Sequence, residues 1–231
     1  MSKVRWIIFA AVIVLILGGL IVYSRINSGK TEDIGNADAS AVIAASDKNG
    51  QIADHVFNNT KSEVVLIEYG DFQCPGCGAA YPNLNTLLET YGDKISFVFR
   101  NFPLTSIHPN ARAAAAAAEA AGLQGKYWEM HDYLYENQSD WSNLDAKERT
   151  GAFKQYAQGL GLDATKFEKD IASSNVNQKI SFDQSLGTNA KVNSTPTFIL
   201  NGEILPEAAS TGILQGDLTE IKKLLDEKLA N

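Results

Sequence analysis

The chain of 231 residues contains two cysteines, and they stand three positions apart in the run Cys74-Pro75-Gly76-Cys77. Two cysteines placed at random would have this spacing roughly one time in a hundred, so the pair needs a chemical explanation. The apolar run from Val64 to Tyr69 predicts a buried strand, and the apolar spacing from Ala79 to Tyr91 predicts a helix. The pair is therefore expected at a strand-to-helix turn, with Cys74 at the start of the helix.

A helix N-terminus favours a thiolate over a thiol, because its first N–H groups lack partners and the helix dipole is positive there. The thiolate is the form of cysteine that attacks a disulfide. Pro75 suits the first helical position, where no backbone donor is needed. We therefore predict that Cys74 is an exposed nucleophile with a low pKa and that Cys77, one turn later, is the resolving thiol.

Two other roles for the cysteine pair are weaker. A structural disulfide that closes so short a loop would remove little entropy from the unfolded chain. A zinc site would need two more ligands, and the histidines, His55, His108 and His131, show no ligand spacing. A lone histidine after a Pro-Leu segment, such as His108, or on an amphipathic helix, such as His131, is more often a packing residue than a catalyst. We expect no metal and no organic cofactor.

The N-terminal residues have the pattern of a membrane anchor. The stretch from Trp6 to Ser24 has no charged residue and lies between Lys3 and Arg5 on one side and Arg25 on the other. As a helix it would span about 28 Å, enough for the hydrocarbon core of a bilayer. We favour an uncleaved anchor over residues 1–25, rather than a cleaved signal peptide, because no small-x-small cleavage pattern follows directly. The positive charges before it place the N-terminus in the cytoplasm and the rest of the chain outside, where disulfides persist.

The chain beyond this segment is acidic. Without Lys3, Arg5 and Arg25, the 20 basic residues fall to 17 against 27 acidic ones, a balance of −10. No basic patch with interleaved aromatic residues occurs, so we expect no nucleic-acid partner. Residues 26–49 are rich in Ser, Asn, Ala, Asp and Gly, which predicts a flexible linker. Residues 50–231 are then one domain.

The domain is predicted to be of the α/β class. The run from Ile95 to Arg100 predicts a second strand, parallel to the first. From about residue 105 to residue 192 the periodicity is helical, which predicts an all-helical insertion. Strand character returns at Thr197–Leu200, Asn201-Gly202 predicts a hairpin turn, and a final amphipathic helix starts at Asp217.

These features resemble the DsbA-like thiol:disulfide oxidoreductases of the thioredoxin superfamily, over roughly residues 54–229. The first βαβ unit and the C-terminal β-hairpin and helix would then form a thioredoxin fold, with the helical block inserted between them. The resemblance rests on four runs, of which the first is specific by itself: Glu68 to Cys77, Phe102-Pro103-Leu104 with Ile107 to Ala111, Tyr127 to Asp132, and Val192 to Phe198 with Asn201-Gly202.

The resemblance implies a redox-active disulfide between Cys74, the nucleophile, and Cys77, the resolving cysteine. It also implies a role for Glu68 as an acidic residue behind the pair. If it is buried there, its pKa would be raised and it could relay the proton of Cys77. The residue pattern alone also allows a solvated glutamate at the edge of the sheet.

The same resemblance implies a substrate-binding surface made of Pro75, Gly76, Thr195 and Pro196. Pro196 would be cis, and its loop would lie against the two sulfurs. The backbone of Thr195 could then pair with an extended substrate peptide as an added strand. Sequence alone would favour a trans proline at the entry to a strand.

The expected function is that of a membrane-anchored, extracytoplasmic oxidoreductase that introduces disulfides into unfolded or reduced exported proteins. The resemblance implies reoxidation by a membrane partner of the DsbB or VKOR type. Strongly oxidising members often carry histidine between the cysteines, where this chain has Pro75-Gly76, so we predict a milder oxidant. A membrane-anchored thiol reductase is the main alternative, and a thioredoxin-fold chaperone or binding module is a further one.

Overall fold

The computed structural model describes residues 33–58 and 61–230. The predicted anchor, residues 1–25, and the first part of the predicted linker lie outside these ranges. Within the described ranges, no helix combines the length and the apolar character needed to cross a membrane.

A five-stranded sheet in the order β1-β3-β2-β4-β5 forms the centre of the domain. Parallel β2 and β3 are joined through helix α2, which confirms the predicted βαβ unit, and the other neighbouring pairs are antiparallel. The predicted hairpin joins β4 to β5, with Asn201 and Gly202 at positive φ. The bounds are β1 (Val56–Asn58), β2 (Val65–Gly70), α2 (Pro75–Tyr91), β3 (Ser96–Asn101), β4 (Thr197–Leu200) and β5 (Glu203–Ile204).

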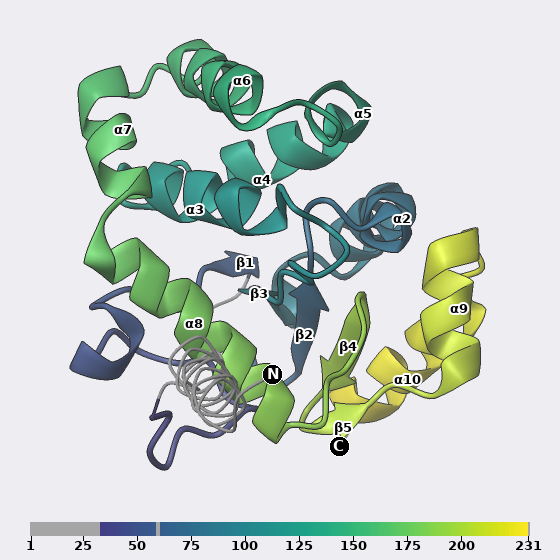
Figure 1. Cartoon of the computed structure of the whole chain (residues 1–231). Coiled ribbons are helices and arrows are strands. Elements are labelled where there is room, and N and C mark those ends of the chain that lie inside the picture. The colour runs from purple at the N-terminus through teal and green to yellow at the C-terminus, as the bar shows by residue number, and fades with distance from the viewer. Residues whose placement is uncertain (1–32, 59–60, 231) are drawn as a thin grey trace, which may run out of the picture. The chain divides into compact units, whose positions relative to one another are not determined.

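Helices fill the segment between β3 and β4, as predicted. Figure 1 shows α3, α4, α6 and α7 as a block on one side of the sheet, with α9 and α10 near β4 and β5. The insertion contains α3 (Ala111–Gly122), α4 (Tyr127–Glu136), α5 (Gln138–Trp141), α6 (Ala146–Gly159), α7 (Ala164–Ile171) and α8 (Ser174–Asn189). Two helices follow the hairpin, α9 (Glu207–Gln215) and α10 (Thr219–Leu229), and two short 3-10 helices are η1 (Asp47–Asn49) and η2 (Gly92–Lys94). The last helix begins two residues later than predicted, and Asp217 Oδ1 accepts a hydrogen bond of 3.0 Å from Thr219 N.

Side chains of β2 alternate between two hydrophobic clusters, because successive residues of a strand face opposite sides of the sheet. Leu66 packs into the larger cluster, with α2 and the helical insertion. Ile67 and Tyr69 pack into the smaller one, on the other face. This alternation places Glu68 on the same side as Leu66, as predicted.

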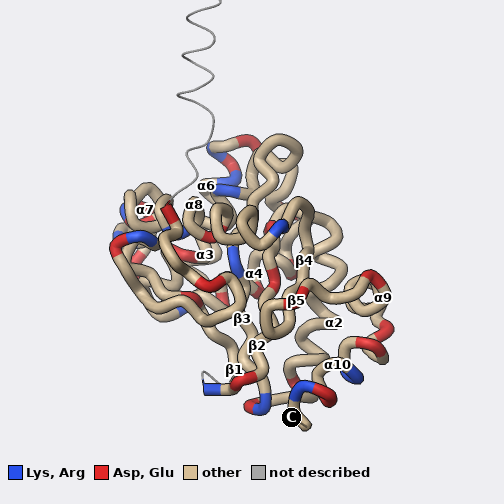
Figure 2. Tube along the Cα trace, turned by 90° about the horizontal axis from the view of Figure 1, so that it is seen from below, with Lys and Arg blue, Asp and Glu red and all other residues tan. Residues whose placement is uncertain are grey.

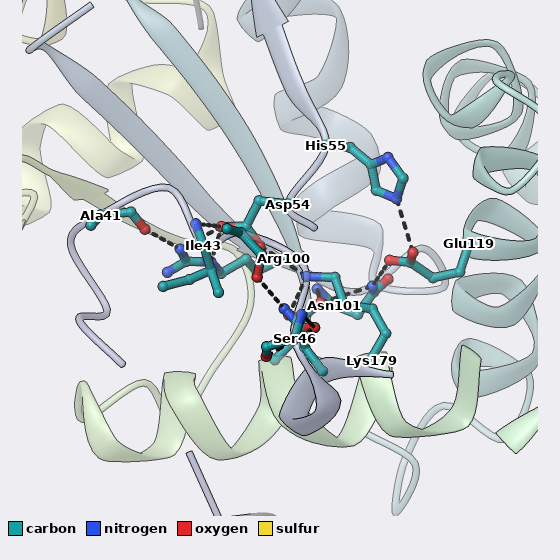
Figure 3. A network of polar contacts seen from close by, with 12 residues as sticks. Ala41, Ile43, Ser46, Asp54, His55, Arg100, Asn101, Glu119 and Lys179 are labelled. Carbon is teal, nitrogen blue, oxygen red and sulfur yellow. Dashed lines mark hydrogen bonds and ion pairs between the residues drawn. The ribbon is translucent and has the colours of Figure 1, made fainter. Parts of the chain in front are cut away.

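Buried charges lie on the face of the sheet that Tyr69 occupies, where Arg100 Nη1 donates to the Tyr69 hydroxyl at 3.0 Å. Figure 3 shows this cluster of charges. Lys179 Nζ, on α8, lies 2.9 Å from Asp54 Oδ1 and 2.7 Å from Asp183 Oδ1. Arg100 Nη2, on β3, lies 2.7 Å from Asp54 Oδ2. None of these four side chains is more than 1% exposed. An unpaired charge at this depth would be strongly unfavourable, so the four residues depend on one another.

A second group of polar side chains continues this cluster toward the helical insertion (Figure 3). Asn101 Nδ2 donates to Glu119 Oε1 at 2.7 Å and to Asp183 Oδ2 at 3.1 Å. His55 Nε2 lies 2.9 Å from Glu119 Oε2, and its ring stacks on Tyr127 with the centroids 3.7 Å apart. His55 therefore packs against Tyr127 and pairs with Glu119.

The cluster also binds part of the segment that we predicted to be a flexible linker. Arg100 Nη1 donates to the carbonyl oxygen of Ala39 at 2.7 Å and Nη2 to that of Ala41 at 2.6 Å. Asp54 Oδ2 accepts a hydrogen bond of 2.9 Å from Ile43 N. The structure differs here from the predicted boundary at residue 50, because a buried guanidinium holds the backbone from Ala39 onward.

Replacing Lys179 by methionine should lower the free energy of unfolding by about 3–5 kcal/mol, because Asp54 and Asp183 would lose a buried counter-charge. Urea unfolding at pH 7 measures this loss. The matched control is Lys169→Met on the exposed side of α7, where a change within about 0.5 kcal/mol is expected. Equal stability of the two variants would show that the cluster does not hold the fold.

Candidate active site

The two cysteines lie where β2 gives way to α2. Cys74 is the residue just before the helix, and Pro75 is its first residue, as predicted. Cys74 N donates to Asp71 O at 2.9 Å, and Gly78 N donates to Cys74 O at 3.1 Å, so backbone hydrogen bonds fix the turn. Both thiols are free.

The loop before β4 lies against Cys74. The Thr195–Pro196 peptide bond is cis, which confirms the prediction. The Cys74 thiol donates a hydrogen bond of 3.3 Å to the carbonyl oxygen of Thr195. A Cβ atom on Gly76 would lie 3.3 Å from Pro196 Cδ and 3.6 Å from Cys74 Sγ, so a side chain there would crowd Pro196 and contact Cys74. The structure thus brings Gly76, Thr195 and Pro196 together around the first sulfur.

Hydrogen bonding lowers the pKa of Cys74 to about 5. The largest contribution comes from the Cys77 side chain, and smaller ones come from the Thr195 side chain and from the backbone N–H groups of Cys77 and Gly76, while burial opposes them. α2 contains no Lys or Arg (Figure 2). The thiolate that forms at neutral pH is therefore stabilised by hydrogen-bond donors at the helix N-terminus, as predicted.

Cys74 is less accessible than we expected. Only 8% of the residue is exposed, because the loop that carries Thr195 and Pro196 covers the sulfur. Pro75 beside it is exposed. A reacting partner must therefore approach along this loop and the first turn of α2.

Cys77 and Glu68 lie behind Cys74, in the interior. Cys77 is 1% exposed, and burial, together with its interactions with Cys74 and Glu68, raises its pKa well above that of a free thiol. Glu68 is 2% exposed. Burial and then the negative charge of Cys74 raise the pKa of Glu68 to about 8, while a hydrogen bond with Cys77 opposes this rise. The predicted position of Glu68 is confirmed, and the solvated alternative is wrong.

Several residues that support the turn were not predicted. Asp71 Oδ2 lies 2.7 Å from His108 Nδ1 and accepts a hydrogen bond of 2.9 Å from Leu104 N. Gln138 Nε2, on α5, donates to the carbonyl oxygens of Phe72 at 2.7 Å and Cys74 at 2.9 Å. His108 therefore helps to orient Asp71. Contacts such as that of Gln138 leave no local signal in the sequence.

The described residues include no group of three or more His, Cys, Asp or Glu side chains arranged to hold a metal ion. His131, the third histidine, lies on α4 with its ring centroid 4.9 Å from that of Phe99 and 5.5 Å from that of Phe72. His131 is thus part of an aromatic cluster that also contains Phe72 and Phe99.

A family model described as Thioredoxin matches residues 51–220. Among curated proteins, the Na(+)/H(+) antiporter NhaA 1 of Salinispora arenicola is 40% identical over 149 residues, or 64% of this chain. The antiporter NhaA 1 of Mycolicibacterium vanbaalenii is 38% identical over 153 residues. The chain spans 22% of the first protein and 23% of the second, so the match covers a small part of each.

Solved structures show the same fold. A thioredoxin-like oxidoreductase from Silicibacter pomeroyi DSS-3 is 25% identical, with a TM-score of 0.58, over 74% of this chain and 92% of that one. Oxidised BdbD from Bacillus subtilis has a TM-score of 0.65 at 20% identity, over 83% of this chain and 99% of that one. The alpha-DsbA1 protein of Wolbachia pipientis also has a TM-score of 0.65 at 20% identity, over 77% and 91% of the two chains. These matches confirm the predicted fold, with its helical insertion.

Alkylation of the reduced protein should modify Cys74 and spare Cys77. The rate of carbamidomethylation at Cys74 should rise with a midpoint near pH 5, because only the thiolate reacts. Mass spectrometry of the labelled peptides between pH 3 and pH 9 measures both sites. In Cys77→Ala, the midpoint should move to higher pH, because the largest stabilising hydrogen bond is lost. A midpoint near the value of a free thiol in the wild-type protein would contradict this arrangement.

Glu68→Gln should stabilise the reduced protein at neutral pH. The pKa of Glu68 is about 8 in the folded protein and about 4.5 in the unfolded chain, so the folded state holds its proton more tightly. The wild-type protein should therefore lose stability as the pH rises from about 4.5 through 8, with a cost of about 3 kcal/mol at pH 7.

Urea unfolding at a series of pH values tests this linkage. The difference between Glu68→Gln and wild type should widen between pH 5 and pH 8. Glu63→Gln, at an exposed position before the same strand, serves as the control and should show a constant difference. The same constant difference for Glu68→Gln would refute the raised pKa.

Proposed function

The chain belongs to the thioredoxin family, and from the geometry of its cysteine pair we propose that it is a protein thiol:disulfide oxidoreductase. The observation that carries this proposal is the contrast between the two sulfurs. Hydrogen bonds lower the pKa of Cys74 to about 5, while Cys77, three residues later, is buried with a raised pKa beside Glu68. Two cysteines that form only a structural disulfide would not need one sulfur to be a thiolate at neutral pH. The antiport named for the curated relatives plays no part in this proposal, because the chain spans about a fifth of their length.

The proposed reaction starts from the disulfide between Cys74 and Cys77. A substrate thiolate attacks Cys74 Sγ, the bond between the two cysteines breaks, and Cys77 leaves with the electron pair. Glu68 donates its proton to the Cys77 thiolate. A second substrate thiolate then attacks the substrate sulfur of the mixed disulfide, and Cys74 leaves as a thiolate. The substrate dithiol has lost two electrons, and the cysteine pair has gained them.

We propose that the natural direction is disulfide donation. The low pKa of Cys74 supports it, because a stable thiolate favours the reduced form of the pair and makes Cys74 a good leaving group. The Pro75-Gly76 sequence between the cysteines adds no positive charge, and the protein is therefore proposed to be a moderate oxidant. A reductase remains the alternative if the potential of the pair is low.

The proposed substrate is an unfolded polypeptide that lies along the Thr195–Pro196 loop. The carbonyl oxygen of Thr195 is 3.3 Å from Cys74 Sγ, so a strand paired with this backbone would hold its own cysteine near the nucleophile. Pro75 is exposed and Gly76, Thr195 and Pro196 are half-buried, so the four surround the covered sulfur and remain reachable.

The proposed location is the outer side of the cell membrane, with residues 1–25 as a single-pass anchor and the N-terminus in the cytoplasm. The uncharged stretch from Trp6 to Ser24 and the positive residues before it support this proposal. A disulfide donor on that side would need a membrane protein of the DsbB or VKOR type to reoxidise it.

The reduction potential of the Cys74–Cys77 pair tests the direction. The full-length protein in detergent, equilibrated in glutathione buffers, should give a potential less negative than the value of about −270 mV for thioredoxin. A value at or below that of thioredoxin would favour the reductase. Cys74→Ser should abolish disulfide transfer to a reduced, unfolded protein. A chaperone, by contrast, would still suppress aggregation of such a protein with that substitution.

A further inference from the structure

A pocket of about 190 Å³ lies between α2 and α4, beside strands β1 and β3. Its lining runs from exposed to buried residues: Phe57 is 37% exposed, whereas Leu88 and Phe97 are 4% and 2% exposed. The pocket therefore opens to solvent at one end and reaches the interior at the other. An engineered protein cavity of about 150 Å³ binds benzene, so this pocket has room for a group of roughly that size.

Aromatic rings form much of the wall of this pocket. The ring centroid of Trp128 lies 5.2 Å from that of Phe57, 5.7 Å from that of Phe97 and 5.1 Å from that of His131. Tyr81 continues the wall, with its centroid 5.9 Å from that of His131. Aromatic rings carry partial negative charge on their faces and attract cations, most strongly when the cation has lost its water.

The charged side chains at the open end of the pocket are acidic. Glu89 on α2 and Asp132 on α4 belong to its lining, Glu89 is exposed, and the Asp132 side chain is 44% exposed. Neither α2 nor α4 contains Lys or Arg. Lys126, just before α4, lies 2.7 Å from Glu129. The two helices thus favour a cation in the pocket and disfavour an anion.

The deep end of the pocket selects against a cation that needs hydrogen bonds. Glu68 Oε1, His131 Nε2 and the Tyr135 hydroxyl belong to lining residues, but each atom has less than 1 Å² of accessible surface. A bound group therefore cannot reach these three atoms. A primary ammonium or a guanidinium would lose its water there without replacing the lost hydrogen bonds. A quaternary ammonium has no N–H group and needs no such partner.

We propose that this pocket binds the quaternary ammonium group of a small cation that carries no anionic group, as choline does. The methyl groups lie against the aromatic wall of Trp128 and Phe57, and Glu89 and Asp132 supply the negative charge at the mouth. The acidic mouth distinguishes a free cation from a phosphocholine lipid head group, because it repels the phosphate. The proposal goes beyond the disulfide chemistry proposed above and does not depend on it.

Titration of choline into the full-length protein in maltoside detergent tests the proposal. Calorimetry should show saturable binding, and saturation-transfer NMR should show the strongest protein contact at the trimethyl protons. The neutral analogue 3,3-dimethyl-1-butanol has the same shape and should bind at least about tenfold more weakly, because it lacks the charge that the rings attract. Phosphocholine should bind at least about threefold more weakly than choline.

Absence of saturable choline binding would overturn the proposal. Equal affinity for choline and the neutral alcohol would do so too, because the pocket would then be merely apolar. Phosphocholine binding as tightly as choline would overturn the restriction to cations without an anionic group.

Variants locate the binding. Trp128→Leu should weaken choline binding about tenfold, and Phe57→Leu, which also keeps an apolar side chain, decides the matter if Trp128→Leu does not fold. Tyr133→Leu, at a position of α4 outside the pocket lining, is the aromatic control and should leave the affinity unchanged. Glu89→Gln should weaken binding about twofold, and Glu220→Gln on α10 should not. Unchanged affinity in the folded Trp128 and Phe57 variants would show that choline binds elsewhere.

Discussion

The antiparallel pairing of β2 with β4 is the contact on which the whole site depends. Its register sets Tyr69 opposite Thr197, so the loop before β4 arrives beside the turn that follows β2. Cys74 and Thr195, which are 121 positions apart, then meet through the thiol and the carbonyl oxygen. A slip of one residue would turn the buried side chains of β4 to the wrong face, so the packing of the sheet protects the geometry at the sulfur.

The site separates two chemically identical thiols by their surroundings. Cys74 lies at the end of the helix among hydrogen-bond donors, whereas Cys77 lies one turn deeper, beside a carboxyl group in the interior. The first environment stabilises a negative charge and the second opposes it. The fold therefore gives the two sulfurs different pKa values without a positively charged side chain in α2.

The parts of this structure that follow from local patterns could be predicted. The helical and strand periodicities predicted the order of the main elements but missed β1 and α9, and the spacing of the cysteines predicted the position of Cys74 at a helix start. Contacts between distant, irregular segments could not be predicted. Arg100 stands in an apolar run that indicates a strand. Nothing near it in sequence indicates that its side chain binds Asp54 and the carbonyl groups of Ala39 and Ala41. The resemblance implied that the Pro196 loop lies against the sulfurs, but not that Cys74 would be only 8% exposed.

The binding of Ala39 and Ala41 by Arg100 has a consequence for how far the catalytic domain could travel in the proposed anchored protein. Before Ala39, Asp33 also contacts the domain, because its carboxylate lies 2.9 Å from Lys48 Nζ, but both side chains are exposed and such a pair is weak. The hold on the backbone at Ala39 therefore leaves residues 26–38 between the proposed anchor and the domain. Thirteen residues, 26–38, can extend over at most about 45 Å, less than the 24 residues of the predicted linker would allow. If residues 1–25 anchor the chain, the contacts of Arg100 would therefore shorten the tether of the domain from 24 residues to 13, and its maximum length by nearly half.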